Sequence, residues 1–103
     1  MKVVSNSSPL IFLSAIGMLD LLKAEFGEIL VPEAVYEEVT SKELKGSNEV
    51  KHAEWIKVQT IKNIEMLSFL PMLDRGEESA IVLAMEQEAD LVYWMTLLEE
   101  GLL

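Results

Sequence analysis

Short apolar runs alternate along this 103-residue chain with longer stretches in which apolar residues have helical spacing. Short apolar runs bounded by polar or turn-forming residues are typical of strands that are covered on both faces. Such runs occupy residues 3–4, 28–31 and 89–93, whereas residues 56–61 alternate apolar and polar side chains. We therefore predict three buried strands and an edge strand with one wet face.

The segments between the strands have the apolar spacing of amphipathic helices. The predicted helices cover residues 9–16, 18–25, 32–39, 47–55 and 74–85. Pro9 and Pro32 are each placed at the first position of a helix, where a missing N–H costs nothing, and Gly17 is placed at a helix end. The order β-α-α-β-α-α-β-α-β predicts one α/β domain built on a parallel, doubly wound sheet.

A polar turn, Ser5-Asn6-Ser7-Ser8, follows the first predicted strand. Side chains of these types bond nearby backbone groups and suit a turn or a helix N-cap. Because ligands of open α/β sheets bind beyond the carboxyl ends of the strands, this turn is also a candidate site. A capped helix start without any chemistry is an equally good interpretation.

Composition narrows the class of protein. The chain has no cysteine, which excludes disulfides and thiolate metal sites and favours the cytoplasm. No apolar run approaches the length of a membrane span, and the N-terminus becomes polar too early for a signal peptide. With 18 acidic and 8 basic residues, the net charge of −10 disfavours contact with nucleic-acid phosphates. Phosphate binding would require a bridging divalent cation or a basic segment from elsewhere; otherwise the acidity serves only solubility.

Three segments together resemble one known family. They begin Val-Val-Ser-Asn-Ser-Ser-Pro-Leu-Ile at residue 3, Ile-Leu-Val-Pro-Glu-Ala-Val at residue 29 and Leu-Asp-Arg-Gly-Glu-Glu-Ser-Ala-Ile at residue 73. In this order they resemble PIN-domain proteins, most closely the compact prokaryotic branch related to the ribonuclease toxins of toxin–antitoxin pairs. The resemblance implies a three-layer α/β/α fold and cleavage of RNA that depends on Mg²⁺ or Mn²⁺.

Acidic side chains at four positions bind the metal ion in that family. The resemblance places these positions at Asn6, Glu38, Glu77 and a residue near Met95. Asn6 departs from the usual aspartate, and its amide oxygen can coordinate a cation without contributing charge. We expect Asn6, Glu38 and Glu77 to be the catalytic residues, and we expect these three together with Glu78 to hold the metal.

Each carboxylate also has a purely structural interpretation. Glu37 and Glu38 point about 100° apart on a helix and cannot both face one site, so Glu37 replaces Glu38 if the register differs by one residue. Either of them equally fits a solvated helix face. Glu77 lies in the first turn of its helix, where the helix dipole favours a carboxylate without any metal. Asp74 is expected to be the N-cap of the same helix.

The fourth position lacks its carboxylate. Where the family pattern has an apolar pair and then Asp, often Asp-Asp, this chain has Tyr93-Trp94-Met95-Thr96. The codons of these residues must be TAY-TGG-ATG-ACN. Read together with the last base of the Val92 codon, the same letters give NTA-YTG-GAT-GAC, which encodes Ile, Leu or Val followed by Leu-Asp-Asp. The expected motif is thus present in the neighbouring reading frame.

We hypothesise that a one-base deletion near the Val92 codon truncated a longer gene after the fourth strand. Residues 93–103 would then be out of frame. In the neighbouring frame the codons of residues 99–101 contain triplets for Arg or Gly, which would relieve the excess of negative charge. The alternative is a natural short variant whose last residues pack or fray.

Two functions follow from these observations. The first is a toxin-type, metal-dependent ribonuclease acting on RNA, with weak metal binding and little or no cleavage in this form. The second is a non-catalytic interaction module that binds an antitoxin-like protein or a second copy of itself through helices at residues 10–25. Apolar residues such as Trp94 and Leu102-Leu103 favour self-association into a homo-oligomer.

Overall fold

The computed structural model describes residues 1–41, 46–69 and 73–94. The elements follow one another as β1 (Val3–Ser5), α1 (Ser7–Ala15), α2 (Asp20–Phe26), β2 (Ile29–Pro32), α3 (Glu33–Thr40), α4 (Ser47–His52), β3 (Ile56–Gln59), the 3₁₀ helix η1 (Ile64–Phe69), α5 (Arg75–Glu86) and β4 (Leu91–Tyr93). This order confirms the predicted one, with η1 added between β3 and α5. The predictions for residues 95–103 lie outside the described residues.

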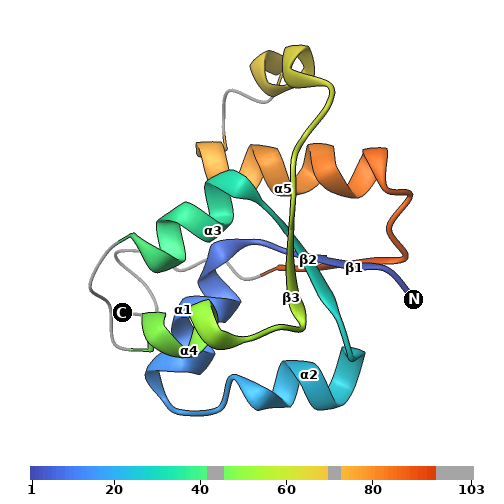
Figure 1. Ribbon diagram of the computed structural model, residues 1–103. Coiled ribbons are helices and arrows are strands. Elements are labelled where there is room, and N and C mark those ends of the chain that lie inside the picture. The colour runs from blue at the N-terminus through green and yellow to red at the C-terminus, as the bar shows by residue number, and fades with distance from the viewer. Residues whose placement is uncertain (42–45, 70–72, 95–103) are drawn as a thin grey trace.

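The strands form one parallel sheet of four strands in the order β3-β2-β1-β4 (Figure 1). Parallel neighbours must be joined by crossover connections, and helices α1–α5 supply these connections. The predicted parallel α/β fold is therefore confirmed. Since the chain adds β2 and β3 on one side of β1 and β4 on the other, the strand order reverses between β1 and β4.

The fourth strand is less buried than its sequence predicts. β3 lies at one edge of the sheet, as expected, but β4 lies at the other edge of the described sheet and pairs only with β1. Leu91 is consequently 39% exposed, whereas Val3 and Val4 in the central strand β1 are fully buried. The prediction of a strand buried on both faces at residues 89–93 is therefore wrong for the described structure.

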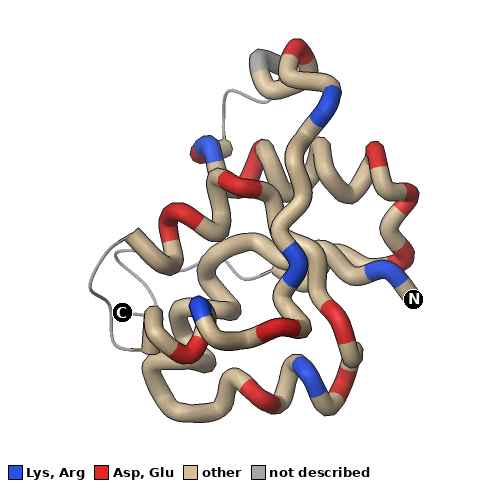
Figure 2. The backbone as a smooth tube through the Cα atoms, in the orientation of Figure 1, with Lys and Arg blue, Asp and Glu red and all other residues tan. Residues whose placement is uncertain are grey.

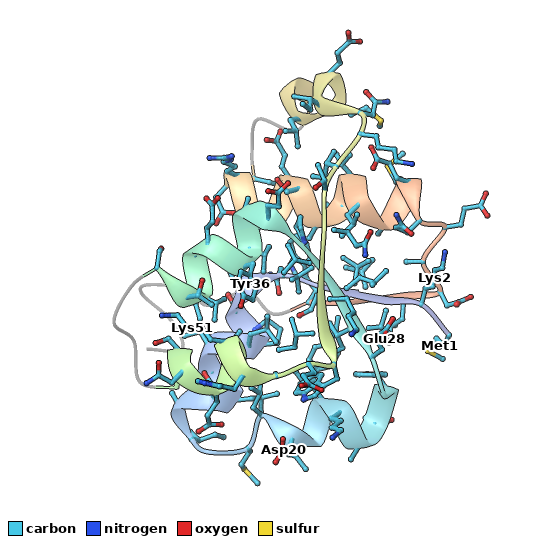
Figure 3. The ribbon with its side chains drawn as sticks, in the orientation of Figure 1. Met1, Lys2, Asp20, Glu28, Tyr36 and Lys51 are labelled. Atoms are coloured by element: carbon cyan, nitrogen blue, oxygen red, sulfur yellow. The ribbon has the colours of Figure 1, made fainter. Side chains whose placement is uncertain are left out.

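Helices cover both faces of the sheet, as the three-layer prediction requires. Successive strand residues point to opposite faces, so the two valines of β1 belong to different cores. Val3 packs with Leu10 of α1 and Val35 of α3, while Val4 packs with Leu83 of α5. Figure 1 shows α5 on one side of the strands and α1, α2 and α4 on the other, and side chains fill both interlayer spaces in Figure 3. No helix within the described ranges has the length and apolar character needed to cross a bilayer.

Several element boundaries differ from the prediction by one to three residues. α4, for example, ends at His52 and not at Trp55. α1 begins at Ser7, which makes Pro9 its third residue, but the third N–H of a helix is also without an intrahelical acceptor, so proline fits there as well. Pro32 is the N-cap of α3 and not its first helical residue. Ala89 belongs to the exit from α5, because its N–H donates to the carbonyl of Ala84 at 2.9 Å, and β4 therefore starts only at Leu91.

The predicted helix end at Gly17 is confirmed. Gly17 has φ +73°, the left-handed conformation that glycine adopts without steric cost. Its N–H donates to the carbonyl of Ser14 at 3.2 Å, and the N–H of Met18 donates to the carbonyl of Leu13 at 2.8 Å. These two bonds close α1 and turn the chain into α2, which starts at Asp20 and not at Met18.

Candidate functional site

The candidate site lies at the carboxyl edge of the sheet. In an open parallel sheet, ligands bind outside the carboxyl ends of strands where the strand order reverses. Here that point is between β1 and β4, and the residue directly after β1 is Asn6. The N–H of Asn6 donates to the carbonyl of Tyr93, the last residue of β4, at 3.3 Å. Asn6 is 2% exposed and is the N-cap residue of α1, so the polar turn is both a helix start and part of this edge.

Glu38 extends from α3 to the first turn of α5. A Cβ atom placed on Gly76 would lie 3.0 Å from Oε1 of Glu38 and 3.6 Å from Cγ2 of Val35. The two helices pack together at this point because Gly76 has no side chain. Glu37 is exposed, whereas Glu38 is half-buried. Of the two adjacent glutamates, the structure therefore brings Glu38 against α5.

The first turn of α5 is closed by a reciprocal pair of hydrogen bonds. Oδ1 of Asp74 accepts the N–H of Glu77 at 2.8 Å, and Oε1 of Glu77 accepts the N–H of Asp74 at 3.1 Å. This arrangement is a capping box, and it confirms Asp74 as the N-cap. The carboxylate of Glu77 thus already has a structural partner. Glu78 is half-buried, and its N–H donates to the carbonyl of Asp74 at 2.9 Å.

Asp74 has a second property that its sequence position did not indicate. Its Oδ1 would lie 3.6 Å from a Cβ on Gly76, so Asp74 and Glu38 border the same point from two different helices. From its sequence position, Asp74 was expected only to cap α5. The signal that could have identified the capping box is the spacing Asp-x-x-Glu at residues 74–77, which directly precedes the apolar stripe of α5.

These oxygen ligands are of the type that Mg²⁺ and Mn²⁺ prefer, but they are too few. Hard divalent cations take oxygen ligands and are held most strongly where several carboxylates converge. No group of three or more His, Cys, Asp or Glu side chains that could hold a metal ion occurs among the described residues. The position near Met95, expected to complete the set, lies outside them. The described residues therefore do not form a complete metal site.

Substitutions in the capping box separate its structural role from any role in metal binding. Glu77→Gln should change the free energy of unfolding by less than about 0.5 kcal/mol, because glutamine also accepts the Asp74 N–H. Asp74→Ala and Glu77→Ala should each lower the free energy of unfolding by about 1 kcal/mol. In Asp74→Ala the N–H of Glu77 loses its acceptor, and in Glu77→Ala the N–H of Asp74 loses its acceptor. Urea denaturation monitored by circular dichroism measures these changes. If Glu77→Gln is as damaging as Glu77→Ala, the charge of Glu77 and not its hydrogen bond stabilises α5.

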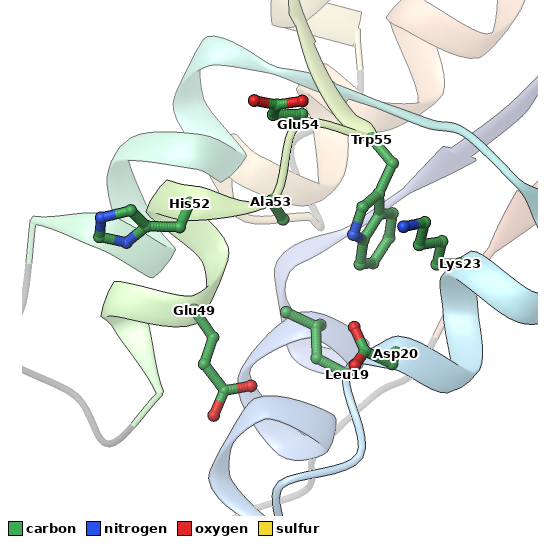
Figure 4. Close-up of a pocket in the computed structure, with 8 residues that line it drawn as sticks. All are labelled: Leu19, Asp20, Lys23, Glu49, His52, Ala53, Glu54 and Trp55. Carbon is green, nitrogen blue, oxygen red and sulfur yellow. The ribbon is translucent and has the colours of Figure 1, made fainter.

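A cavity at the amino end of β3 contains none of the candidate ligands. It has a volume of about 460 Å³ and lies between α2 and the segment from α4 to Trp55, which precedes β3. Figure 4 shows the amine of Lys23 beside the indole ring of Trp55, with the Asp20 carboxylate below it. His52 is exposed, as expected, and its Nδ1 lies 2.7 Å from the carbonyl of Asn48. This cavity is therefore separate from the carboxylates of α3 and α5.

Comparison with known proteins identifies the family. A family model described as a PIN domain matches residues 2–95, which is most of the chain. No curated protein and no solved structure matches the chain. PIN domains are a nuclease-type family that generally uses divalent metal ions and binds nucleic acid. On the strength of this match and of the parallel α/β sheet, the chain belongs to the PIN-domain family.

Proposed function

We propose that this chain is a toxin-type ribonuclease domain of the Mg²⁺- or Mn²⁺-dependent kind whose catalytic site is impaired in this form. The family supports the nuclease part of the proposal. The observation that carries the site is the approach of Glu38 to the first turn of α5, where Asp74 and Glu77 also lie. In this proposal Glu38 and Glu77 are the metal ligands, with Asn6 assisting and Glu78 beside them.

Three features support the impairment. The Glu77 carboxylate accepts a backbone hydrogen bond within the capping box. Asn6 supplies an uncharged amide where the family has an aspartate. The family match ends at residue 95, next to the codons whose neighbouring frame encodes Asp-Asp. When bound at such a site, a divalent cation activates water and offsets the charge of the phosphate, and both effects require a fuller set of carboxylates than the described residues provide.

The test is a cleavage assay on labelled RNA with Mn²⁺ or Mg²⁺, together with calorimetric titration of Mn²⁺. We expect weak Mn²⁺ binding and no cleavage above background for the unmodified chain. Glu38→Gln and Glu77→Gln are compared with Glu37→Gln, which removes the same charge from an exposed neighbour. Mn²⁺-dependent cleavage that disappears in the first two variants and persists in Glu37→Gln would contradict the impairment and support intact catalysis.

The second candidate function is an interaction module, and an apolar surface favours it. α1, α2 and the turn between them expose apolar side chains, namely Phe12, Ile16, Met18 and Leu21. A cavity of about 480 Å³ adjoins them, with mostly apolar walls contributed by α1, α2 and Tyr93 of β4. An antitoxin-like protein or a second copy of the chain could cover this surface. Sedimentation velocity over a concentration series tests self-association: a clean monomer at all concentrations argues against the second copy.

A further inference from the structure

The positive charges of this acidic chain are not evenly placed. Residues 55–64, which include edge strand β3, contain two lysines, Lys57 and Lys62, and no acidic residue. Arg75, the only arginine of the chain, is the first residue of α5. Acidic residues occur on α2, α3, α4, η1 and α5 (Figure 2). Asp74, Glu77 and Glu78 lie next to Arg75 in the sequence, so the basic residues offset only part of the negative charge on this side of the molecule. Phosphate binding here therefore depends on a direct contact with Arg75.

A small cavity connects these segments at the carboxyl edge of the sheet. It has a volume of about 180 Å³ and lies between the residues that follow β3, the first turn of α3 and the first turns of α5. Its apolar walls are formed by Ala34, Ile61, Ile64 and Leu67. Hydroxyl groups of Thr60 and Ser79 and the charged groups of Glu33 and Arg75 complete the lining. The cavity thus combines apolar surface with hydrogen-bond donors and acceptors.

The segment that contributes Ile61 and Ile64 to this cavity is held to α5 by hydrogen bonds from its backbone to the Glu86 side chain. The N–H of Lys62 donates to both carboxylate oxygens of Glu86 at 3.0 Å, and the N–H of Asn63 donates to Oε2 at 2.5 Å. Hydrogen bonds to an ionised acceptor are stronger than neutral ones, so the segment between β3 and η1 is held against the helix. The cavity is therefore preorganised by the fold.

Arg75 links the cavity to the candidate site. It lines the cavity, and the next residue, Gly76, is the point against which Glu38 packs. Arg75 is exposed, and within the described part of the chain its guanidinium forms no ion pair. A guanidinium in this state can bind a phosphate through two parallel N–H donors. A phosphate held by Arg75 would lie beside the carboxylates of α3 and α5.

We infer that this cavity and Arg75 form a nucleotide subsite for single-stranded RNA. Arg75 holds a backbone phosphate, the apolar walls receive an unstacked base, and Thr60, Ser79 and Glu33 bond to the edge of that base. A base in a duplex is paired and stacked and cannot enter, which is why the ligand is single-stranded. The inference rests on the proposed function for the choice of RNA as substrate, but it concerns binding and not cleavage.

The first test measures binding of a fluorescently labelled single-stranded RNA to the full chain by anisotropy in EDTA, where no metal-dependent cleavage occurs. Arg75→Ala should weaken binding about tenfold, equivalent to about 1.4 kcal/mol. It should also reduce the slope of log K against log[salt] by about 0.7, the value for one phosphate contact on a single strand. Lys51→Ala is the matched control, since it removes the same charge from α4, which packs against α1 and α3 (Figure 3). The control should change binding less than twofold.

The second test examines the base. Ala34→Leu fills part of the cavity and should weaken binding several-fold without changing the salt slope, because no phosphate contact is lost. Ala24→Leu adds the same group on α2, in the wall of the separate cavity beside α1, and should leave RNA binding unchanged. Thermal melting checks that both variants are folded. If Ala34→Leu does not fold, Ile64→Asn tests the same wall from an exposed position.

Two results would overturn the inference: no measurable RNA binding by the unmodified chain, or equal losses for Arg75→Ala and Lys51→Ala. Arg75-dependent RNA binding together with Mn²⁺-dependent cleavage that is lost in Glu38→Gln would leave the subsite standing and contradict the proposed impairment. RNA binding that is insensitive to Arg75→Ala, without cleavage in Mn²⁺ or Mg²⁺, would contradict the subsite and leave the proposed impairment standing. The two proposals can therefore fail separately.

Discussion

Reading the gene in the neighbouring frame after Val92 is expected to produce Mn²⁺-dependent cleavage of RNA, whereas we expect no cleavage by the present chain. One base inserted into the Val92 codon makes the following letters NTA-YTG-GAT-GAC, so that positions 95 and 96 each encode aspartate. The carboxyl end of β4 lies beside Asn6, at the point where the strand order reverses. Carboxylates that follow this strand would join a site that now has too few of them. Loss of groups that only orient metal ligands lowers metal affinity by about 10–100-fold, so added ligands should tighten Mn²⁺ binding by at least that factor.

A matched pair of variants isolates the carboxylates from the rest of the altered frame. Met95→Asp with Thr96→Asp is compared with Met95→Asn with Thr96→Asn in the otherwise unchanged chain, because asparagine has nearly the same size without the charge. Calorimetry should show tighter Mn²⁺ binding only for the aspartate pair. Equal binding by both pairs would contradict the hypothesis. So would genomic DNA in which the neighbouring frame closes within a few codons, and the interaction module would then be the better interpretation.

The fold could be predicted because each strand carries its own signal. Val3 and Val4 are both apolar, which is the composition of a strand with helices on both faces, and the structure places them in different cores. The alternation in residues 56–59 likewise identified β3 as an edge strand. β4 could not be placed in this way, because its apolar residues do not say how many neighbours pair with it.

The site could be predicted only in part. Val35 and Val39 are buried on α3, and Glu38 lies three residues after Val35, on the same side of the helix. The spacing of Val35 and Val39 in the sequence could therefore have indicated that Glu38, and not Glu37, faces the interior. The approach of Glu38 to Gly76 could not be predicted, because it depends on how closely α3 and α5 pack in three dimensions. The cavity beside Arg75 was missed for the same reason, since its walls come from segments far apart in the chain.

The packing of α5 decides whether either proposed site exists. Leu83 is fully buried and packs with Val4, Leu30 and Ala80 between α5 and the sheet. Leu83→Ala should lower the free energy of unfolding by about 3–5 kcal/mol, because it removes transfer free energy and leaves a cavity. Small domains have total stabilities of only about 5–15 kcal/mol, so this is a large fraction. The melting temperature should fall by more than about 10 °C.

Met85→Ala is the control for this experiment, because Met85 lies on the same helix and is exposed. It should change the free energy of unfolding by less than about 0.5 kcal/mol, since a surface side chain contributes little packing. α5 carries Asp74 at its N-cap and Arg75, Gly76 and Glu77 in its first turn, so weakening its contact with the sheet displaces all of them relative to Glu38. Leu83→Ala should accordingly abolish RNA and Mn²⁺ binding at temperatures where Met85→Ala retains both. Equal stability of the two variants would mean that α5 is held by its contacts with α3 and not by the core beneath it.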